Sequence, residues 1–186
     1  MVREYIVEHA SVVARIDQQF LAATQQAIDQ IVAVFKNGKK VLIAGNGGSA
    51  ADAQHFAGEF VCRFKKERRA LPAIALTTDT SVLTAWSNDY SFETVFARQV
   101  EALGSAGDVF IAISTSGNSK NLLAAITAAK QRGMQVISFL GGTGGQMKGL
   151  ATTEISVPST NTPRIQEIHT LLLHIISEEV EKTITT

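Results

Sequence analysis

The chain has 186 residues, of which 45% are hydrophobic and 18% are charged, so its composition excludes an intrinsically disordered chain and allows one domain with a substantial core. Lysine plus arginine and aspartate plus glutamate number 17 each, a balance that excludes strong nonspecific attraction to nucleic acid or to an anionic membrane. The single cysteine, Cys62, excludes an internal disulfide framework. No apolar run approaches the roughly 18 residues of a membrane span, and the N-terminus does not resemble a signal peptide, so we expect a cytoplasmic protein.

Residues 2–36 carry apolar side chains at helical spacing, which predicts two helices with a break near residues 22–25 and an end at Asn37 and Gly38. The rest of the chain alternates short apolar runs with helical patterns. The expected strands are residues 41–44, 73–76, 109–113, 136–140 and 154–157. The expected helices are residues 49–63, 80–86, 92–103, 119–132 and 164–183. This alternation predicts a doubly wound α/β sandwich with a mostly parallel, five-stranded sheet, in a single domain over residues 1–186.

A hydroxyl-rich loop, Ser-Thr-Ser-Gly-Asn-Ser at residues 114–119, lies between the third expected strand and the helix that follows it. A strand that enters a helix through small hydroxylated residues and a glycine presents backbone N–H groups and a helix N-terminus to an anion. Ser114, Thr115, Ser116 and Ser119 would add hydroxyl donors, which suit a phosphate. The alternative interpretation is a polar turn in which Ser119 is the helix N-cap, and the loop alone does not decide between the two.

A second loop, Gly-Asn-Gly-Gly-Ser-Ala at residues 45–50, directly follows the first expected strand. It matches the relaxed dinucleotide fingerprint G-x-G-x-x-A, but the region about 20 residues further on is basic where that fingerprint requires an acid. Glycines that let the backbone approach a ligand, next to the polar Asn46 and Ser49, fit a sugar phosphate better. Ligands of doubly wound sheets bind beyond the carboxyl ends of the strands, which is where both loops are expected.

Two polar sets on helices are candidates for acid–base or metal chemistry. His55 and Glu59 are four residues apart, so they share one helix face and can bind a metal or share a proton, although a solvent-facing pair is the commoner outcome. Gln166 and His174 are eight residues apart, about 80° around the last helix, so both can face one cleft. His169 points about 140° away from His174. Because His174 lies in an apolar stretch, a core histidine is the alternative interpretation.

Two further residues are candidates for ligand contacts at the edge of the site. Arg63 opens the only basic stretch, residues 63–69, and a solvated helix end is the alternative for most of this stretch. Asp89 could form hydrogen bonds with sugar hydroxyls, and a local turn stabilised by its carboxylate is the alternative.

Four motifs, in this order and at these separations, resemble the sugar isomerase (SIS) domain and, within it, the phosphoheptose isomerases. They are Gly-Asn-Gly-Gly-Ser at 45–49, Asp-Ala-Gln-His-Phe at 52–56, Ser-Thr-Ser-Gly-Asn-Ser at 114–119 and Arg-Ile-Gln-Glu-Ile-His at 164–169. The resemblance covers nearly the whole chain. It implies a flavodoxin-like three-layer fold and a homotetramer with sites at subunit interfaces, in which residues 1–37 serve oligomerisation and residues 38–186 form the core.

The resemblance also implies an activity and a role for each motif residue. The activity is conversion of D-sedoheptulose 7-phosphate to D-glycero-D-manno-heptose 7-phosphate, the first step of ADP-heptose and lipopolysaccharide heptose biosynthesis. Glu59 and His174 would transfer protons through an enediol, and one zinc ion per subunit would bind His55, Glu59, Gln166 and His174. The implied substrate contacts are Asn46, Gly47, Gly48, Ser49, Arg63, Asp89, Ser114, Thr115, Ser116, Ser119 and Gln166.

Two other functions are compatible with the same fold. Some closely similar SIS-domain proteins are non-enzymatic partners of the bacterial replication initiator DnaA and lack the acid–base pair, whereas Glu59 and His174 are both present here. A sugar-phosphate-sensing regulatory domain is disfavoured by the same pair and by the lack of a DNA-binding segment. Pro163 precedes Arg164 where some family members carry an acidic residue, and we interpret it as a tolerated variant because proline suits the start of a helix.

Overall fold

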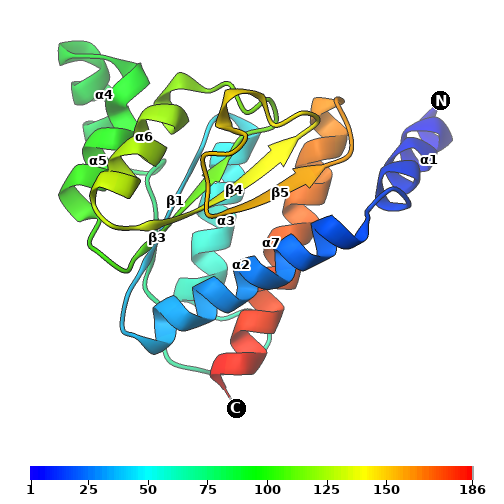
Figure 1. The fold of residues 1–186 in the computed structure, drawn as a ribbon, viewed down its shortest axis with the longest axis horizontal. Helices are drawn as coiled ribbons and strands as arrows, with labels where there is room; N and C mark the ends of the chain where they lie inside the picture. The colour runs from blue at the N-terminus through cyan, green and yellow to red at the C-terminus, as the bar shows by residue number, and fades with distance from the viewer. Residues whose placement is uncertain (186) are drawn as a thin grey trace.

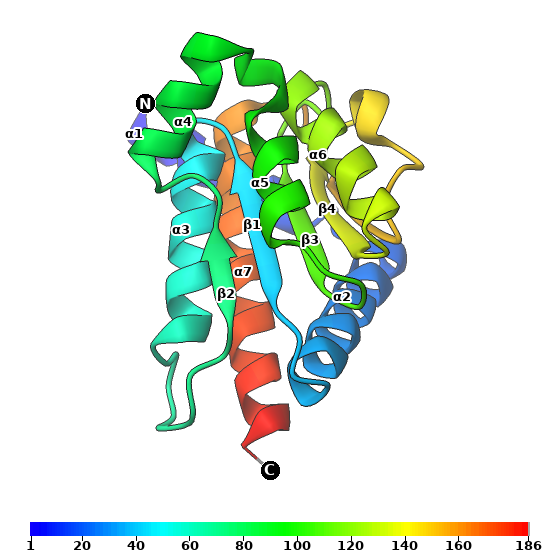
Figure 2. The same ribbon diagram turned by 90° about the vertical axis from the view of Figure 1, so that its left-hand side faces the viewer.

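The computed structural model describes residues 1–185, which form a three-layer α/β sandwich (Figures 1 and 2). The strands are β1 (Val41–Gly45), β2 (Ala73–Ala75), β3 (Val109–Ile113), β4 (Gln135–Gly141) and β5 (Thr153–Val157). The α-helices are α1 (Val2–Val13), α2 (Gln18–Lys36), α3 (Gly48–Val61), α4 (Thr80–Asp89), α5 (Val95–Leu103), α6 (Lys120–Gln131) and α7 (Thr162–Ile184), and two short 3-10 helices are η1 (Phe92–Thr94) and η2 (Gly145–Met147). Within the described part of the chain, no helix has the length and apolar character needed to cross a membrane.

The strand order is β2-β1-β3-β4-β5, and every neighbouring pair is parallel. Val41 of β1 lies opposite Ala73 on one side and Val109 on the other. The chain therefore winds from β1 to one edge of the sheet and then returns to β3 on the other side of β1. This confirms the predicted doubly wound, flavodoxin-like fold, and it places the switch point, where such sheets bind ligands, between β1 and β3.

The central strands are buried on both faces, so alternate residues enter two separate cores. Val41 and Ile43 pack in a core that also contains α2, α3 and α7, whereas Leu42 and Ala44 pack in a core with α5 and α6. This two-sided burial explains the predicted runs of consecutive apolar residues, because a parallel strand covered by helices on both faces has no side exposed to water. In Figure 1, α4, α5 and α6 accordingly lie on one side of the sheet, and α2 and α7 lie on the other.

The N-terminal segment contains two helices, but the predicted break at residues 22–25 is wrong. The helices separate at residues 14–17, where the Asp17 carboxylate caps α2 by accepting a hydrogen bond from Phe20 N at 2.9 Å. Thr24, in the expected break, lies buried inside α2, and its hydroxyl is satisfied within the helix by donating to the Phe20 carbonyl at 2.8 Å. At the other end of the chain, Pro163 is the second residue of α7, where a missing N–H costs nothing.

Candidate active site

The crevice at the switch point is bordered by the two predicted loops. The glycine loop follows β1 and leads into α3, and the hydroxyl loop follows β3 and leads into α6. Because β1 and β3 are neighbours in register, both loops leave the sheet side by side. An open hollow of about 360 Å³ lies at this point, lined by Asn46, Phe92, Glu93, Ser119, Lys120 and Asn121.

A pair of amides joins the two loops. Asn46 Nδ2 donates to Asn121 Oδ1 at 3.0 Å, and Asn121 Nδ2 donates to Asn46 Oδ1 at 2.9 Å. Asn121 is buried, at 4% exposure, so this pair fixes the orientation of the half-buried Asn46 amide. Sequence analysis identified Asn46 but missed Asn121, whose only signal was a polar residue in the first turn of the helix after the hydroxyl loop.

The hydroxyl loop is folded on itself, and the hydroxyls of Ser114 and Ser119, at its two ends, lie close together. Ser114, at 4% exposure, accepts from Gly117 N at 3.1 Å, and its Oγ lies 3.3 Å from Ser119 Oγ. Ser119 occupies the N-cap position of α6, but its side chain makes no capping hydrogen bond. The hydroxyl therefore does not fill the role that the simple-turn interpretation assigns to it. Thr115 is half-buried and Ser116 is exposed.

Gly117 must be glycine for this loop to form. Its φ is +65°, and a Cβ would lie only 1.9 Å from the Gly144 carbonyl oxygen. Backbone cannot move aside as a flexible side chain can, so any other residue would displace the whole turn.

The glycine loop lies against the start of α7. Gly47 is the N-cap of α3 with φ +56°, and the next residue, Gly48, is so close to the side chain of Gln166 that a Cβ would lie 2.6 Å from Nε2. Ser49 is buried, at 3% exposure. The Gln166 amide, predicted as both substrate contact and metal ligand, is thus placed beside the loop after β1.

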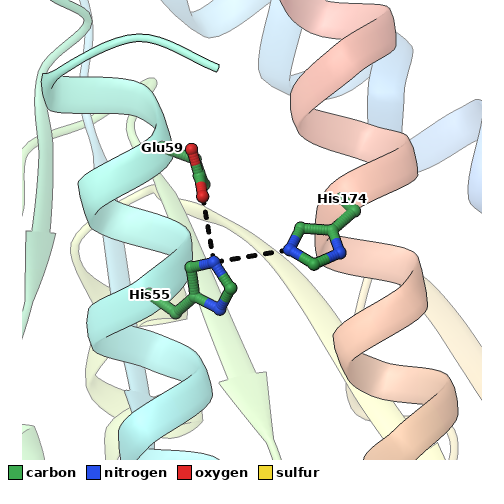
Figure 3. Close-up of side chains that lie close together, drawn as sticks. All are labelled: His55, Glu59 and His174. Carbon is green, nitrogen blue, oxygen red and sulfur yellow. Dashed lines mark hydrogen bonds and ion pairs between the residues drawn. The ribbon is translucent and has the colours of Figure 1, made fainter. Parts of the chain in front are cut away.

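Three titratable side chains from α3 and α7 form a cluster (Figure 3). His55 Nε2 lies 2.9 Å from Glu59 Oε1 and 3.4 Å from His174 Nε2. The three ligand atoms all lie within 4.8 Å of one another. Predicted as two separate pairs on two helices, these residues therefore share one place, where Glu59 from α3 and His174 from α7 both contact Nε2 of His55 (Figure 3).

The cluster remains accessible to a ligand. The exposed fraction of the side chain is 42% for His55 and 21% for Glu59, and His174 is half-buried. The ring of Phe64, from the loop after α3, packs at 5.7 Å from the ring of His174. His174 is therefore not a core histidine, and the alternative interpretation is wrong.

His169 has the core position instead. It is fully buried, its Nε2 lies 3.1 Å from the Leu140 carbonyl oxygen, and burial lowers its pKa to about 4. At neutral pH this imidazole is uncharged and has no access to a ligand. The predicted divergence of His169 from His174 around α7 is confirmed. His169 points into the core, and His174 points toward α3.

The helices α3 and α7 run side by side in the same direction. Gly48 contacts Gln166, Thr170 Oγ1 donates to Asp52 Oδ1 at 3.0 Å, and His55 faces His174. Asp52 is buried, and this burial raises the pKa of its carboxyl. These three contacts follow one another along the two helices from the crevice to the cluster. Along the axis of α7, Gln166 and His174 are about 12 Å apart.

Two predicted ligand contacts lie at the surface of the single chain. Arg63 pairs with Glu67, with Nε 2.9 Å from Oε1, and Asp89 accepts a hydrogen bond from Asn88 Nδ2 at 2.9 Å. Both are exposed. Asp89 ends α4, which packs on the face of the sheet opposite to α3 and α7, whereas Arg63 follows α3 but turns its side chain to Glu67 at the surface.

Comparisons with known proteins give the family of the chain. A family model of the SIS domain matches residues 4–141. A phosphoheptose isomerase of Burkholderia pseudomallei is 55% identical over 168 residues, covering 90% of this chain and 85% of the relative. One of Citrifermentans bemidjiense is 50% identical over 181 residues, covering 97% and 94%.

A solved structure gives the same result in three dimensions. The structure of phosphoheptose isomerase GmhA from Neisseria gonorrhoeae has a TM-score of 0.91 and 43% identity, and the match covers 97% of this chain and 97% of that chain. The similarity extends over the N-terminal helices, the sheet and the helices that carry the cluster. The chain therefore belongs to the SIS domain family and, within it, to the phosphoheptose isomerases.

Proposed function

We propose that this chain is an aldose–ketose isomerase that converts D-sedoheptulose 7-phosphate to D-glycero-D-manno-heptose 7-phosphate, the first step of ADP-heptose and lipopolysaccharide heptose biosynthesis, in the cytoplasm. Membership of the phosphoheptose isomerase family supports the reaction. The observation that carries it is the convergence of Glu59 and His174 on His55 Nε2, within 4.8 Å of one another, because isomerisation requires a base and an acid at one place.

The reaction moves a proton between C1 and C2 of the sugar and a second proton between their oxygens. The Glu59 carboxylate removes the carbon proton, and a cis-enediolate forms as the carbonyl oxygen gains charge. His174, from the other helix, donates a proton to that oxygen and removes one from the neighbouring hydroxyl. The protonated Glu59 then returns its proton to C2 as the C1 oxygen becomes the carbonyl, which completes the isomerisation and restores both side chains.

The phosphate binds at the crevice, away from the acid and the base. Ser114, Thr115, Ser116 and Ser119 supply hydroxyl donors, and the N-terminus of α6 adds its unpaired backbone N–H groups. Loop residues Asn46, Gly47, Gly48 and Ser49, together with Gln166, contact the sugar. Arg63 and Asp89 contact it from the surface of the chain. No titratable side chain occurs in residues 114–119, as expected of a segment that holds the substrate without reacting.

The donor set at the cluster fits a zinc ion. Two histidine nitrogens bound to tetrahedral zinc at 2.0–2.1 Å would lie about 3.4 Å apart, and the two Nε2 atoms lie 3.4 Å apart. We propose that His55, Glu59 and His174 hold one zinc per subunit, and that Gln166, whose amide lies beside Gly48 in this structure, would turn toward the cluster as the fourth ligand. When bound, the ion supplies positive charge that stabilises the developing enediolate.

The N-terminal segment, residues 1–37, serves to build a homotetramer with sites at subunit interfaces. Apolar side chains that a monomer would leave in water support this proposal. The exposed ones in this segment are Met1, Val2, Tyr5, Ile6, Val7, Val13 and Leu21. Next to them, a hollow of about 320 Å³ between α2 and α7 is lined mainly by apolar residues. Neighbouring subunits would cover both features, as large exposed apolar patches usually mark interfaces.

The alternative, a non-enzymatic partner of the replication initiator DnaA, is not favoured because both members of the acid–base pair are present and lie together in one cluster. The decisive experiment incubates the purified chain with sedoheptulose 7-phosphate and zinc and measures formation of the aldose. Glu59→Gln and His174→Gln should each abolish turnover with an unchanged circular dichroism spectrum. Absence of turnover in the wild type, together with specific DnaA binding, would overturn the proposal.

A further inference from the structure

A buried ion pair lies where the ends of α3 and α7 meet. Arg68 Nε is 3.2 Å from Glu181 Oε1, and the exposed fraction of both side chains is only 2%. Taking two charges out of water is costly, and their mutual attraction roughly offsets this cost only where further hydrogen bonds complete their surroundings. Such a pair adds little net stability, so its other contacts are the better guide to its role.

Arg68 caps the C-terminal end of α3. Its Nη2 donates to the carbonyl oxygen of Glu59 at 2.6 Å, and its Nη1 donates to that of Phe60 at 2.8 Å. The last carbonyls of a helix have no partner within the helix, so the guanidinium supplies one. The same contacts fix the backbone position from which the Glu59 carboxylate extends into the cluster.

Glu181 holds the segment that packs against His174, the second residue of the acid–base pair. Its carboxylate accepts hydrogen bonds from the backbone N–H groups of Phe64, Lys65 and Lys66 at 2.9, 2.7 and 2.9 Å. The Phe64 ring packs against the His174 ring, with centroids 5.7 Å apart. Burial alone would raise the pKa of Glu181, but these three N–H donors and the adjacent guanidinium lower it, so the carboxylate is charged at neutral pH.

The spacing along α7 places this pair on the face that carries the cluster. Glu181 follows His174 by seven residues, which is two turns and within about 20° of the same direction. On the other side of His174, Thr170 is bonded to Asp52 of α3. The His55–His174 contact thus lies between two polar bridges that join the same two helices.

We propose that Arg68 and Glu181 are positioning residues, which hold Glu59 and His174 at the separation that metal binding and proton transfer require. Arg68 acts through the Glu59 backbone, and Glu181 acts through Phe64. The catalytic part of this inference rests on the proposed isomerase function, whereas the geometric part concerns the cluster alone. The pair therefore predicts an effect on metal affinity that does not depend on any substrate.

The test uses Arg68→Lys, which keeps the buried positive charge but cannot reach both carbonyls. The double variant Arg68→Met/Glu181→Met removes both charges, so neither is left buried alone. Glu178→Gln is the matched control, because Glu178 pairs with Lys65 at 2.7 Å and also joins this loop to α7, but at the surface. Titration with Co²⁺ alone, followed by its visible absorption, measures the affinity of the cluster in each full-length variant.

We expect Co²⁺ affinity to fall at least tenfold in Arg68→Lys and in the double variant, and kcat to fall similarly with KM within twofold of wild type. Glu178→Gln should match wild type in all three quantities. Folded variants with wild-type Co²⁺ affinity and kcat would overturn the inference, because the ion pair would then have only a structural role. A rise in KM at constant kcat would overturn it as well. If the wild type binds Co²⁺ but has no isomerase activity, the proposed function fails while the affinities still decide the positioning role.

Discussion

Replacement of Gly48 by alanine should separate activity from stability. A Cβ at this position would lie 2.6 Å from Gln166 Nε2 and 3.0 Å from its Cδ, which is closer than real atoms approach. The obstructing atoms are the end of a flexible side chain, so the amide moves and the backbone stays. Shifting one side chain costs about 0.5–1.5 kcal/mol, and alanine recovers up to about 1 kcal/mol of helix propensity. The free energy of unfolding should therefore change by less than about 1 kcal/mol.

Activity should respond much more strongly, because Gln166 loses its place beside the glycine loop. We expect kcat/KM for sedoheptulose 7-phosphate to fall at least tenfold, which corresponds to about 1.4 kcal/mol of transition-state binding. Gly58→Ala is the matched control on the same helix, since nothing lies within 4 Å of its added methyl group. This control should raise stability by about 0.5–1 kcal/mol with unchanged kinetics.

A double-mutant cycle identifies the cause of the loss. If Gly48→Ala acts by displacing the Gln166 amide, it should have little further effect in a Gln166→Ala background. Equal losses in both backgrounds would mean that the methyl group obstructs the substrate directly. Wild-type kcat/KM in the single variant would refute the role assigned to Gln166.

Two other predictions concern the remaining histidines. His169, with a pKa of about 4 in the fold, stays neutral where the unfolded chain takes up a proton near pH 6.5, so its contribution to stability is complete above pH 6.5 and is lost as the pH falls to 4. The complete loss is about 3 kcal/mol, and about 2.5 kcal/mol of it should separate urea unfolding of the wild type at pH 7 from that at pH 4.5. His169→Gln should show a flatter dependence, and equal dependences in the two proteins would contradict the prediction. Zinc at a hundredfold excess over its dissociation constant should stabilise the wild type by about 2.7 kcal/mol, which is visible as a higher Tm that EDTA reverses. His55→Ala should show no shift in Tm. A shift in this variant equal to that of the wild type would refute the cluster as the binding site.

The order of strands and helices could be predicted because each buried strand is a short apolar run between two helical patterns. The break was wrongly predicted at residues 22–25 because helical periodicity continues across the true break at residues 14–17. The break is set by Asp17, a local cap that periodicity does not detect, whereas Thr24 packs in the core as a buried residue of α2. Short-range capping chemistry thus decided what hydrophobic spacing left open.

Within the site, residues were predictable when their signal was local. The two loops are recognisable because they directly follow strands, and His55 and Glu59 because they are one helical turn apart. Arg68 and Asn121 were missed because their partners, Glu181 and Asn46, lie 113 and 75 residues away in the chain. From sequence, Arg68 was one cation in a basic stretch expected to be mainly solvated, yet it is almost completely buried.

The placement of Arg63 and Asp89 gives a physical reason for a site shared between subunits. Arg63 pairs with Glu67 and Asp89 bonds with Asn88, so within one chain both side chains are engaged at the surface and not at the cluster or the two loops. A second subunit could supply one of them, and the exposed apolar side chains of α1 provide a surface on which it could dock. The segment between α3 and β2 that carries Arg63 also carries Arg68. The buried ion pair of Arg68 would then hold in place both the proton-transfer cluster of its own chain and the edge of the site that the neighbour completes.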